Sequence, residues 1–180
     1  MIVLAGASAS GKTEVAKLLA KKYGITKIIT TTTRSQRVGE IDGRDYFFVN
    51  EKRFNKMIDE NRFVEYTRYN GFLYGSTKDQ IADNKVVVID PAGLKSYINL
   101  KNKYFIVTFF LEADEQTRKE RMIFRGDDMD KINSRILHDR IAFKKENIAT
   151  VDYIIDSSKN RSIENVTDEI YNLYIKLAAK

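Results

Sequence analysis

The chain has 180 residues, 43% of them hydrophobic, and this length predicts one domain with a single buried core. It contains no cysteine, which excludes disulfides and thiolate metal sites, and only one histidine, His138, which excludes a histidine-based metal cluster. The net charge of +6 is compatible with nucleic acid or with small phosphate compounds as ligands. The basic residues form no long arm and do not alternate with aromatic residues, so we expect no nucleic-acid partner.

Two apolar runs, residues 2–5 and 104–111, are too short for a signal peptide or a membrane span. We therefore expect a cytoplasmic protein with no membrane partner, either a monomer or a homodimer. The absence of cysteine fits a reducing compartment.

The first predicted elements are a buried strand over residues 2–5, a helix over 12–23 and a short strand over 27–30. The helix carries apolar residues at helical spacing, and Gly24 ends it. The middle of the chain differs, with short aromatic-rich strands at 46–49, 62–69 and 71–75 around a helix at 51–60. Asn70-Gly71 between two of these strands favours a hairpin, so we expect a small, mostly antiparallel insertion.

The later part returns to alternating strands and helices. The run 85–89 is almost continuous valine and isoleucine, which is typical of strands buried on both faces of a parallel sheet. Strands separated by helices indicate right-handed βαβ units, so the predicted fold class is α/β, with three layers and a mainly parallel sheet. The remaining elements are strands at 104–111 and 152–155 and helices at 114–124, 128–148 and 162–178.

Residues 6–13, GASASGKT, match the phosphate-loop pattern G-x-x-x-x-G-K-S/T between a predicted strand and a predicted helix. Glycines let the backbone curl so that N–H groups point at phosphate oxygens, and the helix N-terminus favours the anion. Lys12 would reach the β- and γ-phosphates, and the Thr13 hydroxyl would bind Mg²⁺. The predicted ATP-binding residues are Gly6, Ser8, Ser10, Gly11, Lys12 and Thr13, with Thr13 as the metal ligand and Mg²⁺, bound with ATP, as the cofactor.

A second group of polar residues could bind another phosphate. Arg34 and Arg37 offer guanidinium groups that pair with phosphate oxygens, and Tyr46 offers a neutral donor. Taken alone, these residues could equally form a solvated basic loop.

The region around these residues resembles the GMP-binding part of the guanylate kinase family. That family carries TTR-x-P-R-x-G-E, then G-x-D-Y-x-F-V, F-x-E and Y-G-S/T. This chain has TTRSQRVGE, GRDYFFV, Phe63-Val64-Glu65 and Tyr74-Gly75-Ser76 in the same order, and a later RG…INSRI segment also matches. The resemblance covers nearly the whole chain and is weaker after Ile89.

The resemblance implies an ATP-dependent nucleoside-monophosphate kinase that converts GMP to GDP in purine nucleotide metabolism, with ATP and GMP as its small-molecule partners. It implies a P-loop kinase core (1–30, 77–112 and 149–180), a GMP-binding insertion (31–76) and a helical lid (113–148) within one domain. It places Arg34, Arg37, Tyr46 and Tyr74 on the GMP phosphate, Thr30, Glu65, Ser76 and Asp90 on guanine, and Lys12, Arg125 and Arg135 in catalysis.

Chemistry supports Glu65 as the residue that selects the base. Guanine presents N1–H and a 2-amino group side by side, and one carboxylate accepts from both, whereas adenine lacks this pair. The alternative is a salt-bridged glutamate on a sheet surface. Arg121 is either a third phosphate ligand or a helix-surface residue, and Asp127, Asp128 and Asp130 are expected to cap a helix rather than bind metal. No general base is needed, because the GMP phosphate is already an anion.

The chain departs from the family pattern at several positions, which marks it as a divergent member. Val88 stands where an Asp-x-Asp pair usually has its first Asp, so the metal would depend on Thr13, the phosphates and Asp90. Gln36 replaces a usual Pro, Ala92 a usual Gln, and Thr31 a usual Ser or His.

Two other functions stay open from the sequence. One is a kinase for another nucleotide or phosphorylated acceptor, which Val88 leaves possible. The other is a non-catalytic, guanylate-kinase-like module that binds phosphorylated peptides, although such modules usually have degenerate phosphate loops and this one is intact.

Overall fold

The computed structural model describes residues 1–69, 71–144 and 150–179. Its main sheet has five parallel strands in the order β2-β7-β1-β8-β9. Strand β1 is central and all four of its residues are buried, as its apolar run predicts. The mainly parallel sheet is therefore confirmed. The strands are β1 (Ile2–Ala5), β2 (Thr26–Lys27), β7 (Lys85–Val88), β8 (Val107–Glu112) and β9 (Tyr153–Asp156).

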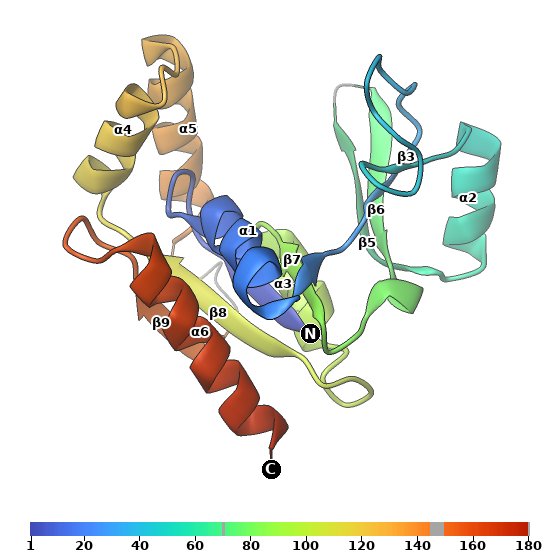
Figure 1. Cartoon of the computed structure of the whole chain (residues 1–180). Coiled ribbons are helices and arrows are strands. Elements are labelled where there is room, and N and C mark those ends of the chain that lie inside the picture. Colours follow the sequence, from blue (N-terminus) through green and yellow to red (C-terminus); the bar gives the residue numbers. More distant parts are fainter. Residues whose placement is uncertain (70, 145–149, 180) are drawn as a thin grey trace.

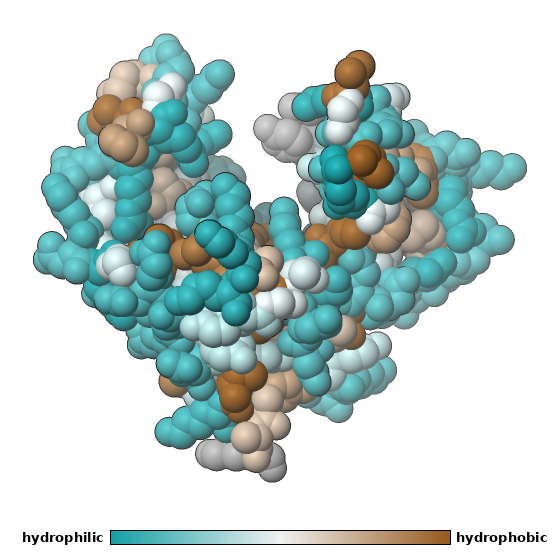
Figure 2. Space-filling view, in the orientation of Figure 1, coloured by the Kyte–Doolittle hydropathy of each residue, from teal (hydrophilic) through white to brown (hydrophobic). Residues whose placement is uncertain are grey.

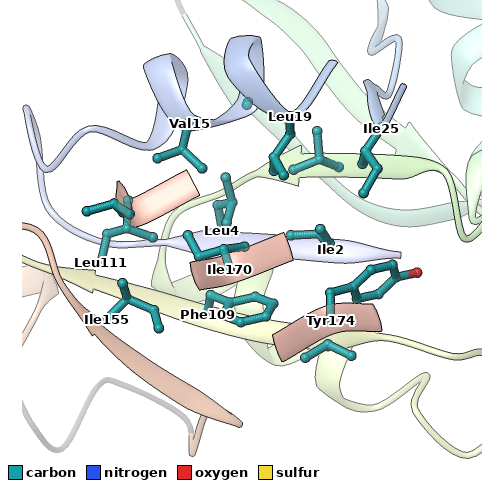
Figure 3. Packing of buried hydrophobic residues seen from close by; sticks show 14 residues of the cluster. Ile2, Leu4, Val15, Leu19, Ile25, Phe109, Leu111, Ile155, Ile170 and Tyr174 are labelled. Atoms are coloured by element: carbon teal, nitrogen blue, oxygen red, sulfur yellow. The ribbon is translucent and has the colours of Figure 1, made fainter. Parts of the chain in front are cut away.

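Helices cover both faces of this sheet and give the three predicted layers (Figure 1). On one face, α1 (Lys12–Tyr23) and α6 (Ile163–Ala178) pack their apolar residues onto β1 and β8. Figure 3 shows Leu19 and Ile170 directed toward Leu4 and Phe109 in this cluster. On the other face, α3 (Pro91–Ile98) packs Leu94 and Tyr97 against alternate residues of β1.

Helix α3 is absent from the sequence-based prediction. Its local signals are an N-terminal cap and a proline: the Asp90 side chain accepts from the Gly93 N–H at 2.8 Å, and Pro91 occupies the first turn. Gly93 within the segment weakens the helical pattern.

A second sheet of four strands, in the order β4-β3-β6-β5, lies apart from the main sheet (Figure 1). The β3–β6 and β5–β6 pairs are antiparallel and β3–β4 is parallel, so the expectation of a mostly antiparallel insertion is confirmed. Helix α2 (Glu51–Asp59) packs Phe54 and Met57 against Phe63 and Leu73 of this sheet. The strands are β3 (Thr31–Thr32), β4 (Phe47–Phe48), β5 (Phe63–Tyr69) and β6 (Phe72–Thr77), and a short 3₁₀ helix, Lys78–Gln80, follows.

One side chain ties together the two segments that connect the sheets. The Gln80 amide accepts from the Ile29 N–H at 2.7 Å and donates to the Ile29 carbonyl at 2.5 Å. The chain leaves the main sheet near Ile29 and returns after Gln80, so both crossings are joined at one place.

Helices α4 (Glu115–Phe124) and α5 (Met129–Ala142) form an arm on the opposite side of the molecule from the second sheet (Figure 1). Their contact is a small apolar cluster of Met122, Ile132 and Ile136, against which Ala9 packs. Figure 2 shows a wide hollow between the α4–α5 arm and the second sheet. No helix among the described residues is long and apolar enough to span a lipid bilayer.

Several predicted boundaries differ from the structure. The strand predicted over 27–30 is β2, which ends at Lys27. The strand predicted over 104–111 starts at Val107, because the Tyr104 N–H bonds the Leu100 carbonyl in a turn. The helix predicted over 128–148 ends at Ala142, and residues 145–148 of that prediction, like Asn70 of the predicted hairpin, lie outside the described residues.

Candidate nucleotide-binding site

The GASASGKT segment forms the turn between β1 and α1. Two of its glycines have backbone conformations that side chains rarely adopt, with φ of 147° at Gly6 and 98° at Gly11. A Cβ on Gly6 would lie 2.6 Å from the Leu111 carbonyl oxygen, so the loop lies too close to β8 for any larger residue. These constraints curl the backbone at the N-terminus of α1, the arrangement that binds phosphate.

Lys12 lies across this loop. Its Nζ donates to the Gly6 carbonyl at 2.5 Å and to the Ala7 carbonyl at 2.8 Å. Burial lowers the pKa of the Lys12 amine to about 8, and the nearby Asp139 carboxylate opposes part of that fall. The ammonium is thus held over the loop at neutral pH and titrates in a mildly basic range.

A cavity of about 450 Å³ opens beside the loop. The phosphate loop and the start of α1 contribute Ala9, Ser10, Gly11, Lys12 and Thr13 to its lining. Arg121 of α4 and Arg125, directly after that helix, also line it, and Glu14, Leu18, Ile163 and Glu164 complete it. Loop amides and cationic side chains therefore share one space with two carboxylates and two apolar side chains. Gly6 and Ser8, also predicted to bind ATP, do not line this cavity: Gly6 is packed against β8, and Ser8 contacts α5.

Three of the four residues predicted to bind the acceptor phosphate lie together beside the second sheet, Tyr74 on β6 and Arg34 and Tyr46 between β3 and β4. The Arg34 guanidinium lies 5.3 Å from the ring centroid of Tyr46, whose ring is 6.2 Å from that of Tyr74. Arg34 also pairs with Glu40 at 2.6 Å, and this contact lowers the pKa of the Glu40 carboxyl. The fourth residue, Arg37, has an exposed side chain, and its main-chain N–H donates to Glu40 at 2.8 Å.

The residues predicted to bind the base are also partly brought together. Ser76 on β6 donates to Glu65 on β5 at 2.5 Å, and burial raises the pKa of the Glu65 carboxyl, with the Asp90 charge adding to the rise. Thr30 directly precedes β3, whose first residue, Thr31, pairs with Gly75 next to Ser76. Asp90 is exposed and caps α3.

Tyr97 is a neighbour of this group that the sequence does not reveal. It is fully buried on α3, and burial raises the pKa of its hydroxyl above the usual range, with the Glu65 charge adding to the effect. Its position depends on α3, the helix missing from the prediction.

The two arginines predicted to act in catalysis meet at one carboxylate on the α4–α5 arm. Arg125 forms an ion pair with Asp127, and Arg135 pairs with the same residue at 2.8 Å. Asp128 caps α5, accepting from the main-chain N–H groups of Asp130 and Lys131, as predicted. Asp127, predicted to cap as well, instead holds the two guanidinium groups close together.

Arg121 is more than a helix-surface residue. Its guanidinium donates to the Ser157 carbonyl at 2.9 Å and to the Ala9 carbonyl at 3.3 Å, so it joins α4 to the phosphate loop.

Among the residues that the structure describes, no group of three or more acidic or histidine side chains could hold a metal ion. Thr13 is exposed and lines the cavity next to Lys12, so its hydroxyl is available to a cation that arrives with a nucleotide.

These features define a class of protein: a three-layer α/β nucleotide-binding protein with a phosphate loop. The family model described as Guanylate kinase matches residues 1–173, and the chain belongs to the guanylate kinase family. A guanylate kinase of Wolinella succinogenes is 34% identical over 164 residues, which are 86% of this chain and 75% of that protein. A guanylate kinase of Anaplasma phagocytophilum is 30% identical over 182 residues, 96% of this chain and 84% of that protein.

The fold has a solved counterpart. The crystal structure of guanylate kinase from Anaplasma phagocytophilum matches with a TM-score of 0.67 at 24% identity, covering 100% of this chain and 86% of that one.

Proposed function

We propose that this chain is an ATP:GMP phosphotransferase, which moves the γ-phosphoryl group of ATP onto the GMP phosphate to give ADP and GDP. The observation that supports the proposal is the presence of two groups suited to bind anions, the phosphate loop with Lys12 at the main sheet and the Arg34–Tyr46–Tyr74 cluster at the second sheet. The second group lies beside the sheet that carries the Ser76–Glu65 pair.

The donor would bind in the cavity beside the phosphate loop. Main-chain amides of Gly11, Lys12 and Thr13 face its phosphates, and Lys12 exchanges its contacts with the Gly6 and Ala7 carbonyls for phosphate oxygens. Mg²⁺ would come with ATP, held by the Thr13 hydroxyl and phosphate oxygens, and would neutralise charge on the transferred group.

The acceptor would bind on the second sheet. The Arg34 and Arg37 guanidinium groups pair with phosphate oxygens, and Tyr46 and Tyr74 donate from their hydroxyls. The Glu65 carboxylate accepts from N1–H and the 2-amino group of guanine, with Ser76, Thr30 and Asp90 around the base. This set leaves adenine without partners, which gives the preference for GMP.

The α4–α5 arm would act as the lid. Arg125 and Arg135 already lie together through Asp127, so one movement of the arm would carry both guanidinium groups toward the transferred phosphoryl group. Closure of the hollow would exclude water and so limit hydrolysis of ATP. The anionic GMP phosphate attacks without a general base, and alignment and charge neutralisation supply the rate.

The proposal divides the single domain into a core (1–30, 77–112 and 149–180), an acceptor insertion (31–76) and a lid (113–148). The two sheets and the separate α4–α5 arm support this division. The proposal also includes a cytoplasmic location, since the substrates are cytoplasmic metabolites, and a monomer or homodimer as the working form.

A coupled assay tests the function directly. The purified protein is given ATP·Mg²⁺ with GMP, dGMP, AMP, CMP or UMP in parallel, and formation of ADP is followed. We expect turnover with GMP and little with AMP, CMP or UMP. Phosphorylation of AMP but not of GMP would overturn the assignment of the acceptor.

A further inference from the structure

A buried ion pair joins the α4–α5 arm to the phosphate loop. Arg118 of α4 and Asp139 of α5 are 7% and 5% exposed, and the Arg118 Nη1 donates to the Asp139 Oδ2 at 2.8 Å. The same carboxylate accepts from the Ser8 main-chain N–H at 2.9 Å and from the Ser8 hydroxyl at 3.2 Å. Both carboxylate oxygens of Asp139 therefore accept hydrogen bonds from Ser8 of the phosphate loop.

The loop is strained at the next residue. Ala9 has φ of 59°, in the left-handed region that residues with a Cβ rarely occupy. Such a conformation persists only where surrounding contacts hold it. Asp139 holds the preceding residue, Arg121 donates to the Ala9 carbonyl at 3.3 Å, and the Ala9 side chain packs on the apolar cluster of the arm.

The Asp139 contact lies outside the lining of the nucleotide cavity, although the Asp139 charge also acts on Lys12. The residues that line the cavity begin at Ala9, and neither Ser8 nor Asp139 is among them. Asp139 is buried, and its charge is balanced by Arg118. A carboxylate in this position does not compete with the phosphates of a nucleotide for the amides of residues 11–13.

We propose that Asp139 is a positioning residue for the transfer reaction, which holds the strained tip of the phosphate loop so that its amides converge on the phosphates of ATP. Arg118 pairs with the carboxylate and fixes its orientation. Because Asp139 belongs to α5, the loop and the arm that carries Arg135 are connected through this contact. The inference rests on the proposed function for the identity of the nucleotide.

The test replaces the whole ion pair, so that no buried charge is left without its partner. The variant Arg118→Met with Asp139→Leu fills the same space with apolar side chains. A matched control removes the second ion pair between the same helices, Arg140 with Glu115 at 2.6 Å, which is exposed. This control carries Arg140→Met with Glu115→Gln.

Dissociation constants for ATP·Mg²⁺ and for GMP are measured separately by calorimetry. We expect the Arg118→Met/Asp139→Leu variant to bind ATP about tenfold more weakly, the usual effect of losing a charged hydrogen bond, while its GMP affinity stays within about twofold. Arg118→Met with Asp139→Asn keeps an acceptor for the Ser8 N–H without leaving a buried charge unpaired, and should recover part of the loss. The Arg140→Met/Glu115→Gln control should bind both nucleotides normally.

Amide hydrogen exchange without nucleotide adds a second readout. Peptides covering residues 7–10 should exchange faster in the Arg118→Met/Asp139→Leu variant than in the control. Unchanged or tighter ATP binding would overturn the proposal, and so would an equal loss of ATP and GMP affinity, which indicates general destabilisation. Phosphorylation of GMP by the unmodified protein, assayed in parallel, reports on the proposed function alone.

Discussion

The hydroxyl group of Ser76 on β6 donates a 2.5 Å hydrogen bond to the carboxylate of Glu65 on the neighbouring strand β5. This contact fixes the orientation of a carboxylate that is otherwise disfavoured by burial, since burial raises its pKa. A fixed carboxylate can present its remaining acceptor positions in one plane, which is what the adjacent donors of guanine require.

Replacing Glu65 by Gln should therefore remove base selection. The amide offers one acceptor oxygen and one donor, and the donor faces a guanine N–H. We expect kcat/KM for GMP to fall about 100-fold or more, with KM for ATP little changed. The coupled assay measures both. Glu60→Gln, at the exposed end of α2, serves as the control; equal losses in the two variants, or a normal KM for GMP in Glu65→Gln, would contradict the role.

The pH dependence of kcat/KM for ATP should reflect the titration of the Lys12 amine. Its amine has a pKa lowered to about 8 by burial, so it is protonated at pH 7 and loses its charge as the pH rises past 8. Only the ammonium form attracts phosphate, and kcat/KM reports groups of the unliganded enzyme, so kcat/KM for ATP should fall by about tenfold per pH unit above that value.

Substitutions of Lys12 distinguish the titration of its amine from the titration of other groups in the enzyme. Lys12→Arg keeps a cation that does not titrate below pH 12 and should show a flat profile from pH 7 to 9.5. Lys12→Met should lower kcat by about 100- to 1,000-fold at all of these pH values. A profile of the unmodified enzyme that stays flat to pH 9.5 would refute the assignment, as would unchanged turnover of Lys12→Met.

Gly75 is a packing requirement of the acceptor sheet. A Cβ there would lie 2.7 Å from two ring carbons of Phe63 and 3.1 Å from Phe54, and these two rings are stacked with centroids 4.4 Å apart. Gly75→Ala should cost about 1–3 kcal/mol in unfolding free energy and should raise KM for GMP more than KM for ATP. Urea denaturation and the coupled assay measure the two effects. Thr67→Ala, on the exposed side of β5, should stay within about 0.5 kcal/mol, and a Gly75→Ala protein as stable as this control would contradict the packing argument.

Val88 offers a gain-of-function test. It lines a cavity of about 390 Å³ together with Thr13, Lys17 and Lys27, so an acidic side chain there would lie near the proposed metal ligand and near two cations. We expect Val88→Asp to raise kcat/KM by about tenfold at limiting Mg²⁺, because a carboxylate adds an oxygen ligand or orders metal-bound water. Val88→Asn is the neutral control. The same activity in Val88→Asp and Val88→Asn would show that the position does not serve the metal.

The sequence predicts the parts of this molecule whose signals are local. The phosphate loop, its flanking strand and helix, and the alternation of strands and helices follow from glycine chemistry and from apolar spacing, and the structure has them at nearly the predicted residues. Helix α3 is missing from the sequence-based prediction because its cap, Asp90-Pro91, precedes a short segment with a central glycine.

Contacts between distant residues could not be predicted in the same way. Arg118 and Asp139 are ordinary charged residues in two helical patterns, and nothing in one sequence indicates that they meet under Ser8. The clustering of Arg34 with Tyr46 and Tyr74 depends on the β3–β6 register, while the exposed position of Arg37 depends on how the loop after β3 turns back through Glu40. Burial and pairing of charges are properties of the packed chain.

The hydrogen bonds between Gln80 and Ile29 have a consequence for how such proteins diversify. Residues 30–79 depart from the core and rejoin it where Gln80 bonds Ile29, and β5 also packs against α3, so length and chemistry away from these two contacts can change without disturbing the parallel sheet. Under the proposed function, selectivity for the receiving molecule is separated from the residues that bind the triphosphate, and we expect a transplanted segment with the same two ends to give the scaffold a new substrate.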